Sequence, residues 1–406
     1  MEDEYRNERK RFINKAVIIS IVVILSIAVI GAMILVAISI LNSTKYSNGE
    51  DLSGYMTRIE DAIKMVKSKY IEDIDTEKLV DGAVSGIADA TGDPYTRYMD
   101  EEEYNQMLNS GNEKYGGLGI HISFDTETEG IVILGIMPNA PAIDADLKIG
   151  DIIISVEGTV VSSKTYYECV DKLKGDAGTE VKLIIKRDNK TFEKTVKREE
   201  ITPNNVESEI MDNNIGYIRI WSFDNNVYKQ FKKEYDKLMA KNISGIIIDV
   251  RNNPGGLVTD TVSILKKMLP KCDIVKLVYK DESERVYKCD GKNKINIPVA
   301  VLVNSSSASA SEILASAIKD SQIGVLIGTK TYGKGIVQEV QQLDGKGALS
   351  ITVAKYYTAS GVEIHKNGIE PNITVELPKE YEKSNNVPRD KDTQLKKAIE
   401  YLKEKM

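Results

Sequence analysis

An apolar run near the N-terminus restricts the fold of this chain more than any other feature. Residues 16–41 contain no Asp, Glu, Lys or Arg, and serine is the only polar residue among them. At a rise of about 1.5 Å per residue, a helix of this length crosses the hydrocarbon core of a bilayer with some tilt. We therefore predict one N-terminal transmembrane helix at 16–41, with the remaining chain folded outside the bilayer.

The charges on either side of this run predict its orientation. Five Lys or Arg residues lie between residues 6 and 15, whereas only Lys45 follows the run closely. The positive-inside rule then places residues 1–15 in the cytoplasm and the rest of the chain on the extracytoplasmic side of the cell membrane. A cleaved signal peptide is the alternative, but its apolar region normally has about 7–15 residues. The longer run here favours an uncleaved anchor.

Composition excludes several classes of function. The net charge is −7, and no block of Lys and Arg is long enough to indicate a nucleic-acid partner. The three cysteines and two histidines show no CxxC motif and no metal-ligand spacing. We therefore expect neither a metal site nor a cofactor. The length of 406 residues is sufficient for two or three domains, each with its own core.

Two of the cysteines flank a predicted hairpin whose register the sequence leaves open. If its turn centres on Glu282, Cys289 lies opposite Val275 and the thiols miss each other. If the turn centres on Lys280-Asp281, Cys272 faces Cys289 and can bond to it.

The chain beyond the apolar run divides into four segments. Residues 42–112 begin as a polar linker and continue as a helical arm, with apolar residues at helical spacing from Tyr55 and again from Thr76. Residues 113–200 predict a small strand-rich domain with one helix at 166–173. Residues 201–377 alternate strands and helices, which predicts a layered sheet covered by helices. Residues 378–406 form a charged tail and a last helix.

Ser309 is a candidate nucleophile because it lies between a predicted strand, 297–303, and a predicted helix that begins near Glu312. Such a strand–turn–helix arrangement projects a side chain from a sharp corner and directs a helix N-terminus at it. Because the chain has only two histidines, the sequence offers few candidates for the histidine of a Ser-His-Asp centre. Lys334, flanked by two glycines, can replace histidine as general base if burial lowers its pKa. The alternative is that the small residues only allow close helix packing.

Several separated motifs in the same order resemble the carboxyl-terminal processing proteases, a serine-lysine peptidase family with an inserted PDZ domain. The resemblance extends from about Tyr55 to Leu377, and the joint order of the motifs argues against chance. The motifs are Gly92-Asp93-Pro94-Tyr95-Thr96, Gly117-Leu118-Gly119-Ile120, Leu147-Lys148-Ile149-Gly150-Asp151, Asp249-Val250-Arg251-Asn252-Asn253-Pro254-Gly255-Gly256-Leu257, Ser307-Ala308-Ser309-Ala310-Ser311-Glu312 and Tyr332-Gly333-Lys334-Gly335-Ile336-Val337-Gln338.

The resemblance implies a fold and a catalytic centre. The fold is an α/β catalytic domain at 201–377, a layered sheet with helices related to crotonases and Clp proteases, with a small mixed-β PDZ domain inserted at 113–200. Ser309 matches the nucleophile, Lys334 the general base, and Gln338 the residue that orients the lysine. Residues four apart on a straight strand lie about 13 Å apart. Lys334 and Gln338 therefore meet only if the glycines bend the chain.

The resemblance also implies where the oxyanion and the substrate bind. Backbone N–H groups of Ala310 and Gly256 are the expected oxyanion donors. The loop Gly117-Leu118-Gly119-Ile120 is expected to present its N–H groups to a free C-terminal carboxylate, with the peptide added as a strand beside it. The helix at 166–173 would receive the last side chain, which favours apolar C-termini. We interpret His365, Arg251 and Asp320 as structural, and His121 also as structural, with lining of the peptide groove as its alternative.

The resulting expectation is a single-pass, membrane-anchored serine endopeptidase facing the extracytoplasmic side, which captures protein C-termini and cleaves nearby. Its helices at the two ends of the chain are expected to form homodimer contacts. One alternative is a PDZ scaffold that is catalytically inactive or depends on an activator, which the complete set of Ser309, Lys334 and Gln338 argues against. Another is a hydrolase of small acyl substrates, which the PDZ insertion argues against.

Overall fold

The computed structural model describes residues 51–109, 114–125, 128–137, 139–162, 165–188, 190–224, 226–344, 346–381 and 387–406. The predicted anchor at 16–41 lies outside these residues. In the part of the chain that the structure describes, no helix is both long and apolar enough to cross a membrane. The chain separates into two compact units, which divide between Val84 and Ser85.

The described part of the first unit is helical, as the apolar spacing predicted. It contains α2 (Ser53–Lys69) and the first part of α3 (Thr76–Asp89). The ammonium of Lys67 on α2 donates a hydrogen bond to the hydroxyl of Thr76, where α3 begins. No residue of α2 is buried. The helix therefore exposes its apolar side chains as well as its polar ones.

A mixed six-stranded sheet forms the centre of the α/β domain in the described residues. The first pair of strands is antiparallel, and the following pairs are parallel. In spatial order the strands are β10 (Val206–Met211), β11 (Ile215–Ile220), β12 (Gly245–Asp249), β15 (Val299–Val303), β16 (Gly324–Gly328) and β19 (Ile373–Thr374).

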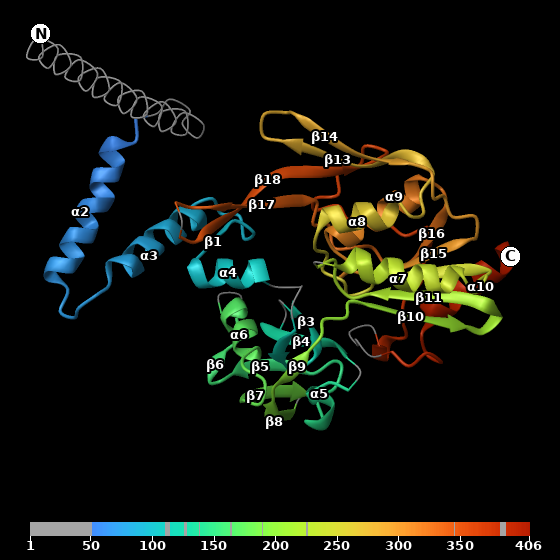
Figure 1. Ribbon diagram of the computed structural model, residues 1–406, viewed down its shortest axis with the longest axis horizontal. Coiled ribbons are helices and arrows are strands. Elements are labelled where there is room, and N and C mark those ends of the chain that lie inside the picture. Colours follow the sequence, from blue (N-terminus) through green and yellow to red (C-terminus); the bar gives the residue numbers. More distant parts are fainter. Residues whose placement is uncertain are drawn as a thin grey trace, which may run out of the picture. The chain divides into compact units, whose positions relative to one another are not determined.

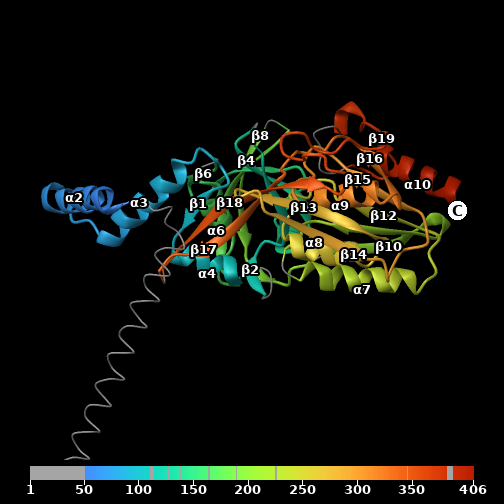
Figure 2. The same cartoon turned by 90° about the horizontal axis from the view of Figure 1, so that it is seen from above.

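Helices cover both faces of this sheet because its central strands are apolar on both sides. Ile246 and Ile248 pack in one hydrophobic cluster and Ile247 in another, on the opposite face. The first cluster includes residues of α7 (Val227–Met239), α8 (Val258–Leu265) and α9 (Ala310–Asp320), and the second includes residues of α10 (Thr393–Lys405). Figure 2 shows α7 and α10 on opposite sides of the strands. The predicted layered sheet is confirmed.

A second sheet packs on the other side of α9, which contacts β13 and β18 as well as β16 (Figure 1). Its strands pair in the order β1-β18-β13-β14, and β17 also pairs with β18. The bounds are β1 (Arg97–Met99), β13 (Lys271–Tyr279), β14 (Glu284–Asp290), β17 (Ile336–Gln342) and β18 (Ala348–Thr358). This sheet brings Lys334, just before β17, towards the N-terminus of α9.

The hairpin of β13 and β14 answers the question of register. Val278 pairs with Glu284 across the turn, and a bulge between Asp273 and Val275 shifts the pairing beyond it. Cys272 therefore lies directly opposite Cys289. Both thiols are free in the structure.

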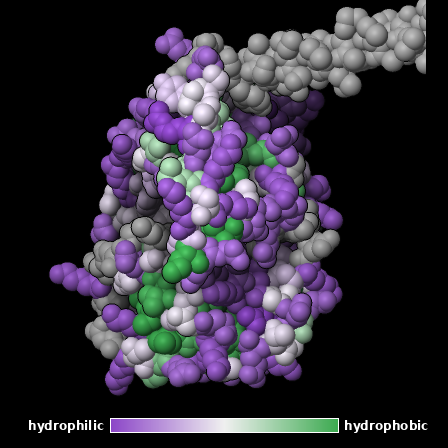
Figure 3. Space-filling view, turned by 90° about the vertical axis from the view of Figure 1, so that its left-hand side faces the viewer, coloured by the Kyte–Doolittle hydropathy of each residue, from purple (hydrophilic) through white to green (hydrophobic). Residues whose placement is uncertain are grey.

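The inserted domain has an antiparallel sheet in the order β3-β4-β5-β7-β8, with β6 paired to β5. Figure 3 shows one face of the molecule, which is mostly hydrophilic, with hydrophobic residues gathered in separate areas. The elements are α4 (Glu101–Asn109), β2 (Tyr115–Gly117), β3 (Ile120–Asp125), β4 (Gly130–Ile136), α5 (Pro141–Asp144), β5 (Ile152–Val156), β6 (Thr159–Val160), α6 (Tyr166–Leu173), β7 (Glu180–Arg187), β8 (Lys190–Lys197) and β9 (Glu199–Ile201), which pairs with β2.

Candidate active site

Ser309 lies at a sharp corner between β15 and α9, as the strand–turn–helix pattern predicted. It is the N-cap residue of α9, with φ 56° and ψ −117°. Side chains rarely occupy this region of backbone conformation, and residues found there cluster at active sites. A Cβ atom on Gly255 would lie only 2.6 Å from Ser309 Cβ. The corner therefore holds Ser309 against a loop that must carry glycine at this point.

Hydrogen bonds fix this glycine loop, residues 253–256, to the serine turn. The carbonyl of Asn253 accepts a bond from Ala308 N–H at 3.0 Å. The side chain of Asn253 accepts a bond from Gly255 N–H at 2.9 Å. In this structure that N–H is occupied, which favours Gly256 over Gly255 as an oxyanion donor. Gly256 N–H, in contrast, donates to no residue within the described chain.

Ala310 N–H is the other predicted oxyanion donor. It is the first N–H of α9, where the helix itself offers no acceptor. Ala310 directly follows Ser309, and the loop carrying Gly256 contacts Ser309 through Gly255. Both predicted donors thus belong to segments that lie beside the serine. Their role in catalysis stays a prediction.

The carboxylate of Glu312 joins the two loops that carry Ser309 and Lys334. One oxygen accepts bonds from Ser309 N–H at 2.9 Å and Lys334 N–H at 2.8 Å. The other accepts from the Thr331 hydroxyl at 2.6 Å and from Gly333 N–H at 2.7 Å. Burial raises the pKa of Glu312, and these hydrogen bonds oppose that shift. Because all four partners donate, the site is suited to the ionised carboxylate.

The side chain of Lys334 lies over the ring of Tyr95, with Nζ 4.0 Å from the ring centroid. Burial lowers the pKa of Lys334, and the carboxylate of Asp93 opposes this shift. Burial would raise the pKa of Asp93 itself, but hydrogen bonds from Thr352 and Thr96 and the charge of Lys334 lower it overall. A lowered lysine pKa increases the fraction of neutral amine, which is the form a general base requires.

The three predicted catalytic side chains are not joined to one another. Ser309 Oγ accepts a hydrogen bond from the hydroxyl of Tyr356 at 3.0 Å. Among the hydrogen bonds between described residues, none links the side chains of Ser309 and Lys334. Gln338 Nε2 donates to Thr352 Oγ1 at 3.0 Å on the neighbouring strand. The chain geometry thus directs Gln338 across the sheet rather than back along its own strand to Lys334.

The residues predicted to bind a C-terminal carboxylate precede an open sheet edge. β3 pairs with β4 on one side and with no other strand in the described part of the chain. Phe124 on β3 contacts Tyr166 on α6, with ring centroids 5.4 Å apart, so α6 borders this edge. In the loop before β3, the N–H groups of Leu118 and Gly119 donate to no described residue. Free N–H groups beside an open edge are the geometry that strand addition uses.

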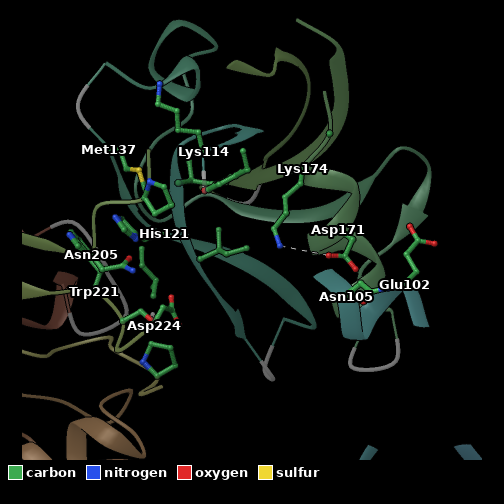
Figure 4. A pocket seen from close by; sticks show the side chains of 18 of the residues that line it. Glu102, Asn105, Lys114, His121, Met137, Asp171, Lys174, Asn205, Trp221 and Asp224 are labelled. Carbon is green, nitrogen blue, oxygen red and sulfur yellow. Dashed lines mark ion pairs between the residues drawn. The ribbon is translucent and has the colours of Figure 1, made fainter. Parts of the chain in front are cut away.

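A cleft of about 980 Å³ lies between the inserted domain and the α/β domain (Figure 4). Residues of β3, α4 and the end of α6 form one part of its wall, and Pro254 of the glycine loop forms another. His121 stacks on Trp221 in this wall, with ring centroids 4.7 Å apart. Burial, together with the charge of Arg219, lowers the pKa of His121 to about 4. The cleft thus connects the edge of β3 with the glycine loop.

Two other polar residues singled out in the sequence belong to the framework. Arg251, at the end of β12, forms ion pairs with Asp249 and with Asp392 at the start of α10. Asp320, at the end of α9, accepts a hydrogen bond from Ser360 N–H at 2.8 Å. Both contacts connect distant segments, in agreement with the structural interpretation of these residues.

Comparison with known proteins identifies the family. Residues 214–375 match the family described as peptidase family S41, residues 107–186 match the PDZ domain, and residues 36–103 match the N-terminal domain of the activating protease CtpB. The carboxy-terminal processing protease CtpA of Bacillus subtilis (strain 168) is 36% identical over 343 residues, which cover 84% of this chain and 72% of the relative. The chain belongs to the carboxy-terminal processing serine peptidases of family S41.

Further members of the S41 family agree with this assignment. The carboxy-terminal processing protease CtpB of the same Bacillus strain is 33% identical over 329 residues, covering 80% of this chain and 68% of the relative. A solved structure, the photosystem II D1 C-terminal processing protease, is similar with a TM-score of 0.61 and 28% identity. That similarity covers 79% of this chain and 93% of the solved chain. The S41 fold with its PDZ domain is therefore confirmed.

Sequence reasoning did not identify Glu312, Tyr95 or Tyr356 as parts of this site. For Glu312 a signal was present, because Ser309 and Glu312 have the Ser-x-x-Glu spacing of a capping box. Tyr95 lies in a motif that served only to establish the resemblance. Tyr356 reaches Ser309 from a strand that pairs with the segment after Lys334, and no local pattern marks such a contact.

We expect Glu312→Gln to reduce both activity and stability. The amide nitrogen cannot accept hydrogen bonds, so at least one buried donor loses its partner, at a cost of about 2–3 kcal/mol in the free energy of unfolding. We also expect kcat to fall about tenfold or more, because the two loops lose their common anchor. Urea unfolding and peptide cleavage by the full chain measure these two effects.

Glu339→Gln provides the matched control, because Glu339 is exposed on β17 and undergoes the same change of charge. We expect this variant to resemble the parent in both measurements. Equal stability and equal kcat in the Glu312→Gln and Glu339→Gln variants would contradict the role given to Glu312.

Proposed function

We propose that this protein is a membrane-anchored, extracytoplasmic endopeptidase that captures protein C-termini through its PDZ domain and cleaves nearby with Ser309 and Lys334. The observation that carries the proposal is the Glu312 carboxylate, which accepts hydrogen bonds from the backbone of both residues. A buried acid that anchors a strained serine and a partly buried lysine supports the proposal of a preorganised catalytic centre.

The proposed reaction proceeds through an acyl-enzyme. Neutral Lys334 accepts the proton of Ser309 Oγ while that oxygen attacks the peptide carbonyl. The electron pair of the carbonyl double bond moves to its oxygen, which binds the N–H groups of Ala310 and Gly256. The lysine then gives its proton to the leaving amine, and later deprotonates the water that releases the acyl group. Gln338 is proposed to orient Lys334, which requires its side chain to leave Thr352.

The proposed substrate is a polypeptide with a free, apolar C-terminus. The free N–H groups of Leu118 and Gly119 would bind its terminal carboxylate, and the open edge of β3 would pair with its last residues. The cleft lined by His121, Trp221 and Pro254 then leads an extended chain towards the glycine loop. Recognition and cleavage would thus occur on one continuous segment of substrate.

We expect the full chain, purified in detergent, to cleave an unstructured peptide that ends in apolar residues. Ser309→Ala and Lys334→Ala are expected to remove cleavage, and an amide in place of the terminal carboxylate is expected to weaken binding. Intact mass spectrometry follows the products. The reaction rate should rise with pH through the lowered pKa of Lys334 and fall as the medium becomes acidic, because protonation removes the base.

The outcomes distinguish the proposal from its alternative. Cleavage by the Ser309→Ala variant would refute the assignment of the nucleophile. Tight binding of the free C-terminus by the parent without any cleavage would instead favour a PDZ scaffold that is inactive or depends on an activator. One observation favours this second candidate. Ser309 Oγ is hydrogen-bonded to the hydroxyl of Tyr356 and not to Lys334, as expected of a centre that is inactive or awaits an activator.

The proposed location follows from the anchor and the basic residues before it. We expect protease added to intact spheroplasts to degrade residues 51–406, while a tag placed before residue 16 stays protected. Immunoblots against the tag and against the α/β domain report the two sides. Protection of the α/β domain until the spheroplasts are lysed would contradict the proposed orientation.

We also propose that the helical arm takes part in a homodimer. Among its exposed apolar side chains, Met56 and Met65 each leave 57% of their surface uncovered. A helix with such side chains and no buried residue is an unused contact surface. We expect Met56→Glu with Met65→Glu to shift the full chain from dimer to monomer in analytical ultracentrifugation. Ser68→Glu, also on α2, is the control and should leave the mass of the parent unchanged.

A further inference from the structure

Tyr356 occupies a position that the proposed mechanism leaves unexplained. It lies on β18, is completely buried, and directs its hydroxyl at Ser309 Oγ, 3.0 Å away. Its backbone N–H donates to the carbonyl of Gly335 at 3.0 Å, one residue beyond Lys334. A single residue therefore contacts the candidate nucleophile through its side chain and the loop of the candidate base through its backbone.

The direction of this hydrogen bond matters for the reaction. A serine hydroxyl has one proton to donate and can accept at its oxygen. If Ser309 donated to Tyr356, its proton would point away from Lys334. With Tyr356 as the donor, the serine proton stays available for transfer to the lysine. The same phenol proton then faces the oxygen on which negative charge develops as the serine proton leaves.

The surroundings keep Tyr356 in its donating form. Burial raises the pKa of its phenol well above the usual range, and the charge of Glu312 adds to this effect. The raised pKa keeps the phenol protonated at neutral pH, so it can donate its hydrogen bond there. The ring is held in the core between the two sheets, together with Leu277 and residues of α9. The hydroxyl is thus carried by a rigid support, as an electrostatic stabiliser requires.

We propose that Tyr356 is a further catalytic residue, which donates a hydrogen bond to Ser309 Oγ and stabilises the negative charge that forms there. The proposal rests on Ser309 being the nucleophile, as proposed above. In the first step of acylation, the proton of Ser309 moves to Lys334 Nζ, the bond from Oγ to the carbonyl carbon forms, and the π electron pair of the carbonyl moves to its oxygen. The phenol proton remains on Tyr356 throughout, so no further proton acceptor is needed.

The test compares Tyr356→Phe with the parent, using the full chain and a peptide with a free apolar C-terminus. Loss of one hydrogen bond to a charged oxygen predicts a decrease in kcat of roughly tenfold to a hundredfold. KM should stay within about twofold, because the proposed role of Tyr356 acts on Ser309 in the transition state and not on binding of the substrate. Peptide affinity measured in the Ser309→Ala background, with and without Tyr356→Phe, should be equal.

Two further variants separate catalysis from structure. Tyr357→Phe removes the hydroxyl of the next residue, whose ring lies beneath the ammonium of Lys276, 5.7 Å from the ring centroid, and should retain the kcat of the parent. Replacement of Tyr356 by 4-aminophenylalanine keeps the ring and places an N–H donor where the hydroxyl was. This variant should recover most of the kcat lost in the Phe variant, even if the Phe variant folds poorly.

The results have clear meanings. A folded Tyr356→Phe variant with kcat within twofold of the parent would overturn the proposal, as would a folded 4-aminophenylalanine variant no better than the Phe variant. Cleavage by Ser309→Ala would instead show that the nucleophile itself is assigned wrongly. Three results together would establish Tyr356 as a catalytic residue: kcat falls in Tyr356→Phe, stays at the parent's value in Tyr357→Phe, and recovers when 4-aminophenylalanine replaces Tyr356.

Discussion

The geometry of the candidate site depends on one buried carboxylate. Glu312 accepts hydrogen bonds from the backbone of Ser309, Gly333 and Lys334 and from the hydroxyl of Thr331. A buried charge is strongly unfavourable without such partners, so any displacement of either loop carries a large free-energy penalty. The candidate nucleophile and the candidate base come from different layers of the fold, and none of the hydrogen bonds between described residues joins their side chains. Glu312 therefore fixes the positions of Ser309 and Lys334 relative to each other by holding their backbone N–H groups.

Much of the fold could be predicted because its elements carry strong local patterns. The helix at 166–173 has the predicted bounds, and α10 begins at Thr393 as expected. Apolar runs that alternate with amphipathic helices were sufficient to predict the layered sheet, since each pattern reports directly on the face that it buries. Ser309 was also recognisable, because its position between a strand and a helix is a property of adjacent residues. The family assignment then followed from several such motifs in a fixed order.

The parts of the fold and of the candidate site that could not be predicted depend on contacts between residues far apart in the chain. The pairing of β17 with β18 positions both Lys334 and Tyr356, but neither strand has a pattern that identifies its partner. The register of Cys272 and Cys289 required a bulge that the sequence does not mark. Gln338 illustrates the same limit, because its spacing from Lys334 was known but the side chain bonds to Thr352 on the adjacent strand. The contact of Glu312 with Ser309 could have been predicted from the capping-box spacing. Its hydrogen bonds to the loop that carries Lys334 could not, because no local pattern marks them.

The backbone of Ser309 has a consequence for the relation between activity and stability. Its φ of 56° lies in a region where glycine is comfortable and a side chain costs about 1–3 kcal/mol. Glycine at this position would relieve that strain and would remove the hydroxyl at the same time. Stability of the fold thus favours glycine at this position, whereas the proposed chemistry requires serine. In the proposed mechanism, the residue whose oxygen begins the reaction is therefore also one whose backbone conformation lowers the stability of the folded chain.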